Sequence, residues 1–102
     1  MPSGYVAILT AELHFPEASS LKAKRQFVRS AKDTLRNRFG ASLAEVDHHD
    51  LWQRATLTVA SVARDASEAQ RLAEKAERYL ASGDWVLVRC HTLIVSPDDL
   101  EP

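Results

Sequence analysis

Cysteine and glycine are both scarce in this chain, and each shortage excludes kinds of site. The single cysteine, Cys90, can form neither an intrachain disulfide nor a cysteine-built zinc site. It lies in an apolar run, so we expect a buried thiol rather than a reactive one. With three glycines, the chain has no Walker loop, no dinucleotide-binding pattern and no G-x-S-x-G motif. A phosphate cradle of backbone amides is therefore not expected.

Long apolar runs are missing as well. No stretch approaches the ~18 consecutive apolar residues that a membrane span needs. Among the first nine residues, the beginning is polar and the apolar part is too short for a signal peptide. We therefore expect a cytoplasmic protein with no membrane partner. Its 102 residues, 45% hydrophobic and 26% charged, suit one globular domain.

The net charge of −1 conceals a strong asymmetry along the chain. Seven cations against one acid give the segment from Ser19 to Phe39 a charge of +6, which leaves −7 for the rest. Charge segregation of this kind is informative about partners, although it says nothing about the fold.

Changes of hydrophobic period predict four strands and two helices. Alternation with period two indicates strands, and spacing of three and four residues indicates helices. Ser19 or Ser20 caps the first helix and Gly40 ends it, whereas Asp65 with Glu68 caps the second. The predicted elements are a strand over 5–15, a helix over 21–39, strands over 41–47 and 52–63, a helix between 65 and 83, and a strand over 85–95.

The order β-α-β-β-α-β has a natural solution. Right-handed crossovers place both helices on one face of a four-stranded antiparallel sheet in the order 4-1-3-2. We therefore predict an α+β, ferredoxin-like domain over 1–95, followed by a short acidic tail over 96–102.

Three stretches carry a family resemblance: Ser20–Arg25, Leu35–Phe39 and Ala44–Ala55. Together they resemble the YlxP-like family, a bacterial family of unknown function, in the right order and over nearly the whole chain. His49 departs from the family pattern, where Gln or Asn is more usual. The resemblance implies a ferredoxin-like fold. Genes of the family tend to lie beside those for translation initiation and ribosome maturation, which implies a link to RNA or ribosomes but no catalytic residues.

One face of the first predicted helix carries a row of cations that we call the basic stripe. At ~100° per residue, its members fall within about 80° of one another. Like charges at this spacing repel by a few tenths of a kcal/mol for each pair, whereas the second helix alternates its signs. We interpret the stripe as a set of phosphate contacts; the alternative is a solvated face neutralised by the acidic remainder of the chain. The stripe consists of Lys22, Arg25, Arg29, Lys32 and Arg36.

The uncovered face of the predicted sheet offers two further surfaces. A polar group, with Glu45 and Asp47 at its edge, forms a candidate sheet-face site: Glu12, His14, Arg54, Arg89 and His91. Its central strands lack the stacking aromatics of an RNA-recognition motif. An apolar group indicates self-association, with scattered apolar exposure as the alternative: Val6, Ile8, Val62 and Leu93.

Several other features receive structural interpretations. The turn 47–50 holds two adjacent histidines, whose side chains should diverge, so we expect no metal. Lys24 and Arg38 should pack their stems near the core and extend their charged groups to solvent. Both tryptophans, Trp52 and Trp85, should pack in the core or at its rim rather than act as stacking platforms.

These observations lead to one prediction with two alternatives. We predict a non-catalytic module that binds RNA or a ribosomal subunit through the basic stripe, without a cofactor. A homodimeric scaffold that binds an acidic protein partner through the same stripe is the first alternative. The second is a small hydrolase with Glu12, His14 or His48 as acid or base.

Overall fold

The elements form in the order that the hydrophobic periods predict. The computed structural model describes residues 3–100 of the chain. These residues form β1 (Tyr5–His14), α1 (Leu21–Phe39), β2 (Ser42–Asp47), β3 (Arg54–Ala63), α2 (Ala66–Ala81), β4 (Val86–Val95) and a short 3-10 helix, η1 (Pro97–Leu100).

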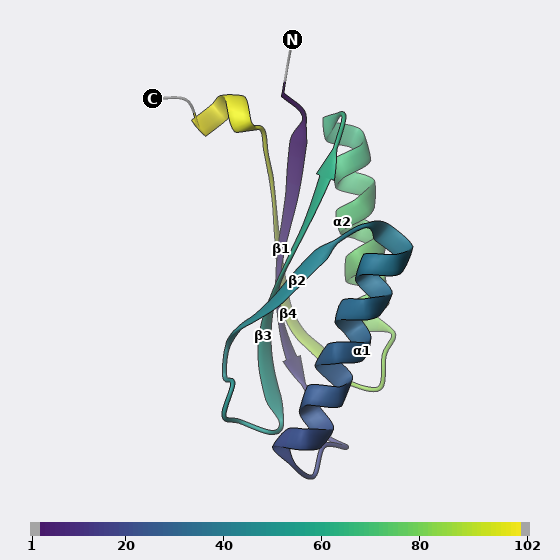
Figure 1. Cartoon of the computed structure of the whole chain (residues 1–102), viewed down its shortest axis with the longest axis vertical. Helices are drawn as coiled ribbons and strands as arrows, with labels where there is room; N and C mark the ends of the chain where they lie inside the picture. The colour runs from purple at the N-terminus through teal and green to yellow at the C-terminus, as the bar shows by residue number, and fades with distance from the viewer. Residues whose placement is uncertain (1–2, 101–102) are drawn as a thin grey trace.

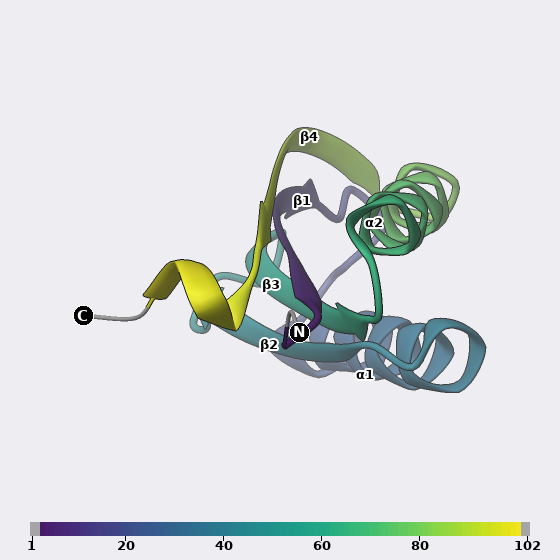
Figure 2. The ribbon, with the colours of Figure 1, turned by 90° about the horizontal axis from the view of Figure 1, so that it is seen from above.

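The four strands form one antiparallel sheet in the order β2-β3-β1-β4, as predicted. Figure 1 shows the two helices side by side along the sheet, and the end-on view of Figure 2 places both on the same face. Within residues 3–100, no α-helix covers the opposite face (Figure 2). This architecture confirms the α+β, ferredoxin-like fold.

Alternating side chains divide β1 and β3 between a buried face and an open one. The odd-numbered apolar residues of both strands face the helices and are buried, whereas the even-numbered residues face away. The helices cover this face with small and branched side chains, and the alanine-rich stripe of α2 lets that helix approach the sheet closely. The buried core includes Leu9, Leu13, Ala31, Leu35, Leu57, Val59, Ala73, Ala76 and Leu80.

Local capping sets the ends of both helices. Ser20 Oγ accepts a hydrogen bond from Ala23 N at the start of α1. Gly40 takes the left-handed conformation at its end, with φ of 63°, which glycine adopts without a steric penalty. Asp65 Oδ1 accepts from Glu68 N at 2.8 Å at the start of α2. These caps confirm three of the predicted helix ends; α2 ends at Ala81, with Ser82 as its C-cap.

Trp85 lies in the core, as predicted. Its side chain is 9% exposed, its indole N–H donates to the carbonyl oxygen of Leu80, and its ring packs against Phe15, Phe27 and Tyr79. A Cβ at Gly83 would lie 2.4 Å from this ring. Glycine is therefore required at position 83 for close packing against Trp85.

The two ends of the described chain meet at the same end of the sheet (Figure 1). Asp98 in η1 accepts hydrogen bonds from Ser3 N at 3.0 Å and Ser3 Oγ at 2.9 Å. Residues 101–102 of the predicted tail lie outside the described residues. Neither helix within residues 3–100 is long and apolar enough to cross a membrane.

Candidate nucleic-acid interface

The basic stripe lies exposed along α1. Its members are spaced alternately by three and four residues, so about one cation occupies each helical turn over ~21 Å of helix. Arg36 Nη2 lies 3.6 Å from Asp33 Oδ1, and both side chains are more than half exposed, so this pair is weak. Within residues 3–100, the other four stripe cations form no ion pair. All five stripe cations are exposed: Lys22, Arg25, Arg29, Lys32 and Arg36.

The stripe follows the flank of α1 that borders the edge strand β2. Lys32 and Arg36 line a hollow together with Ala41, Ser42 and Leu43 at the start of β2. The end-on view shows β2 at the edge of the sheet beside α1 (Figure 2). The cations therefore form a single file along an outer edge of the domain.

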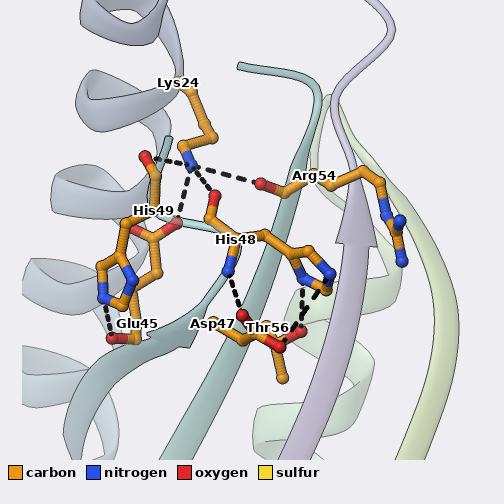
Figure 3. Close-up of polar contacts among 7 residues, drawn as sticks. All are labelled: Lys24, Glu45, Asp47, His48, His49, Arg54 and Thr56. Atoms are coloured by element: carbon orange, nitrogen blue, oxygen red, sulfur yellow. Dashed lines mark hydrogen bonds and ion pairs between the residues drawn. The ribbon is translucent and has the colours of Figure 1, made fainter. Parts of the chain in front are cut away.

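Lys24 lies on the same helix but is fully buried, so the prediction that its ammonium group extends to solvent is wrong. The β2–β3 loop folds over the start of α1 and surrounds the ammonium group with oxygens (Figure 3). Because every proton of the ammonium group finds an acceptor, the charge is tolerated in the interior. The acceptors of Lys24 Nζ are Glu45 Oε2 at 2.7 Å and the carbonyl oxygens of His48 at 2.7 Å, His49 at 3.2 Å and Arg54 at 3.2 Å.

Glu45 faces the helices rather than the open face, which corrects the sequence-based expectation. The regular β2–β3 register places Glu45 opposite the buried Leu57, and a shift of register after Glu45 places Asp47 opposite Thr56, on the open face. The Glu45 side chain, 15% exposed, thereby reaches Lys24. This pair neutralises one cation of α1 internally and leaves the five stripe cations unaffected.

The two histidines of the β2–β3 loop point to different partners, as predicted (Figure 3). His48 Nδ1 lies 3.1 Å from Thr56 Oγ1, whereas His49 Nε2 lies 2.9 Å from the carbonyl oxygen of Glu45. His48 has a φ of 65°, which directs its carbonyl group to Lys24. Within residues 3–100, no three His, Cys, Asp or Glu side chains are grouped as a metal site would require.

The polar sheet-face residues lie together on the open face. The strand register places Arg89 opposite Glu12 and Arg54 opposite His14, with His91 opposite Thr10. The Arg54 guanidinium donates to the Glu12 carboxylate; this hydrogen bond, helped by the charges of Arg89 and His48, lowers the pKa of Glu12. A carboxylate whose pKa is lowered is a poor general acid at neutral pH, which disfavours Glu12 as the acid of a hydrolase.

The apolar sheet-face residues form a patch at the other end of the same face. Val6 lies opposite Val62, and Ile8 lies opposite Leu93. Val62 is 77% exposed and Leu93 is 50% exposed. The register therefore brings all four residues together.

Trp52 lies outside the core and is about half exposed, so of the two tryptophans only Trp85 is a core residue. β3 begins at Arg54, two residues later than predicted, so Trp52 belongs to the β2–β3 loop. Its side chain is 48% exposed and lines a hollow with His14, Leu51, Gln53 and Arg54. In the sequence, the exposure of Trp52 could have been inferred from its position just after the polar turn 47–50, at the beginning of a strand.

A second cationic hollow lies between the C-terminal ends of α1 and α2. It is lined by Arg38, Lys75 and Arg78 together with the rings of Phe39 and Tyr79. Arg38 Cζ lies 5.4 Å from the centre of the Phe39 ring. Sequence reasoning missed this group because the cations of α2 alternate with glutamates along the chain and meet Arg38 only in the tertiary structure.

Cys90 faces the helices from β4. The pKa of its thiol is raised to about 12, mainly by burial. A hydrogen bond to Glu77 and the negative charge of Glu77 add to this increase. The thiol is therefore protonated at neutral pH and unreactive.

Comparisons with known proteins identify relatives without an assigned activity. Residues 6–91 match a family described as "Protein of unknown function (DUF503)". The chain is also similar to a protein of Bacillus subtilis (strain 168) described as "Uncharacterized protein YlxP". The two are 26% identical over 66 residues, which cover 65% of this chain and 72% of the relative.

Proposed function

The chain belongs to the DUF503 family of proteins of unknown function, and we propose that it is a non-catalytic protein that binds RNA or a ribosomal subunit through the basic stripe. The observation that carries this proposal is the single file of five exposed cations on α1. A linear array of this kind suits a linear polyanion better than a compact ligand.

The electrostatics of α1 favour an external anion. Lys24, which is not part of the stripe, already has Glu45 as its counter-ion. Within the stripe, only Arg36 has an ion-pair partner among the described residues, and that pair is weak, so the other four cations are available to a partner. A partner that carries regularly spaced phosphates would relieve the repulsion between neighbouring cations. RNA is favoured over DNA by the resemblance described above, which implies a link to RNA and ribosomes.

The experiment is RNA binding by fluorescence anisotropy across a salt series. Five phosphate contacts to a single strand predict that log K falls with log salt at a slope of about −3.5. The triple variant Arg25→Glu, Arg29→Glu, Lys32→Glu should lose binding at every salt concentration while its circular dichroism spectrum stays unchanged.

A matched control separates the stripe from net charge. The triple variant Arg64→Glu, Arg71→Glu, Lys75→Glu changes the total charge by the same amount, at exposed positions outside the stripe. We expect it to bind RNA with a slope near that of the unmodified protein. Equal losses in both triple variants would refute a stripe-specific interface. No RNA binding by the unmodified protein at low salt would refute the proposal itself.

A homodimeric scaffold is the second candidate function, favoured by the exposed apolar patch around Val62 and Leu93. In that arrangement two sheets would pack face to face, and each stripe would bind an acidic protein partner. Sedimentation equilibrium tests it: a dimer that Val62→Asp converts to a monomer, with no RNA binding, would favour the scaffold.

A further inference from the structure

We infer that the hollow at Trp52 receives an unpaired base, so that the RNA segment recognised by this protein is single-stranded. This inference rests on the proposed function and deepens it by naming the class of RNA. Its basis is an exposed indole, held on a fixed loop, among side chains that can bind a base and its phosphate.

The exposed indole is the first observation. Two tryptophans are present, and Trp85 fills the core whereas Trp52 is 48% exposed. The adjacent Leu51 is also exposed, by 45%. A large flat ring open to solvent is suited to stacking, because every base offers a π-face to it.

The loop that carries Trp52 is held in place on both sides. Leu51 N–H donates to the carbonyl oxygen of His48 at 3.1 Å, and the carbonyl oxygen of Gln53 accepts from Phe15 N at 2.8 Å. The buried Lys24 holds further carbonyl oxygens of the same loop, at His48 and on the far side of Trp52 at Arg54. The indole is therefore positioned before a ligand arrives, which reduces the entropy lost on binding.

The walls of the hollow suit a nucleotide. Gln53 supplies an amide that can both donate to and accept from a base edge, and His14 supplies an imidazole. Arg54 supplies a guanidinium group that also donates to Glu12. Its lining residues include no carboxylate. The volume of about 210 Å³ lies below the ~300–1,000 Å³ of typical small-molecule sites, so the hollow suits one ring system rather than a whole cofactor.

The hollow lies at the same end of the molecule as the start of the stripe. Lys24, which holds the loop, is on α1 between the first two stripe residues, Lys22 and Arg25. Figure 1 shows the beginning of α1 and the β2–β3 loop together at the lower end of the domain. A strand that follows the stripe can therefore deliver a base to Trp52. In a duplex that base would be stacked within the helix and unavailable.

The test compares a single-stranded 12-nucleotide RNA with an RNA duplex of the same length. Trp52→Leu should weaken single-strand binding by about 5- to 150-fold, the range expected for the loss of one stacked base. Trp52→Phe keeps an aromatic face and should retain most of the affinity. Neither variant should change duplex binding through the stripe.

Indole N–H signals in NMR spectra of the unmodified protein give a second measurement that needs no variant. The single strand should shift the Trp52 signal and leave the signal of the buried Trp85 in place. An unshifted Trp52 signal, or equal single-strand affinity for Trp52→Leu and the unmodified protein, would overturn this inference while stripe-dependent binding stood. If the unmodified protein binds neither RNA, the proposed function itself is refuted.

Discussion

Replacing Lys24 with methionine should strongly destabilise the protein. Methionine matches the length of the stem but removes the ammonium group and its four hydrogen bonds. The Glu45 carboxylate, 15% exposed, would then be left in the interior without a counter-ion. Carbonyl groups of the β2–β3 loop would lose a donor at the same time.

The expected loss follows from this geometry. Removing one partner of a buried ion pair costs about 3–5 kcal/mol, because the remaining charge stays desolvated. A domain of this size has a total unfolding free energy of only ~5–15 kcal/mol. Lys24→Met should therefore lower the midpoint of thermal unfolding by at least ~12 °C, and urea denaturation gives the loss directly.

A double variant distinguishes the unpaired charge from the lost volume. Lys24→Met with Glu45→Met removes both charges, and we expect it to be more stable than Lys24→Met alone by about 1–3 kcal/mol. Lys22→Met, an exposed change two residues away, is the control and should stay within ~0.5 kcal/mol of the unmodified protein. A loss below ~1 kcal/mol for Lys24→Met would refute the buried ammonium group.

Two more predictions follow from packing and from titration. Gly83→Ala should lower the free energy of unfolding by about 1–3 kcal/mol in urea, because its Cβ would overlap the buried Trp85 ring; an unchanged near-ultraviolet spectrum and midpoint would contradict this. Glu12, Asp65 and Asp98 have lowered pKa values in the folded protein, owing first to hydrogen bonds from Arg54, Glu68 N and Ser3 N. These carboxylates stabilise the fold at pH values above their pKa in the unfolded chain, and this stabilisation is lost as the pH falls through their pKa in the folded protein. The midpoint of thermal unfolding should therefore drop between ~pH 5 and ~pH 1. The drop should be less steep in the variant Asp98→Asn, which lacks one of the three carboxylates.

Local patterns in the sequence determined the fold and the basic stripe. The alternation in β1, the cap at Ser20 and the left-handed glycine at Gly40 each depend on a few neighbouring residues. The spacing of the stripe likewise depends only on the helical repeat, so one helix face could be drawn before any tertiary contact was known. The sheet order followed because right-handed crossovers leave few other topologies.

Contacts between distant segments decided the rest. Lys24 is buried because a loop more than twenty residues later in the chain surrounds it, and helical spacing carries no information about that loop. Glu45 and Asp47 lie on opposite faces because of an irregularity between them in the β2–β3 register, which pattern alone does not reveal. Trp52 is exposed because β3 begins after it and Trp85 already fills the core. Periodicity describes one element at a time, whereas burial depends on which elements meet, and only the tertiary structure determines that.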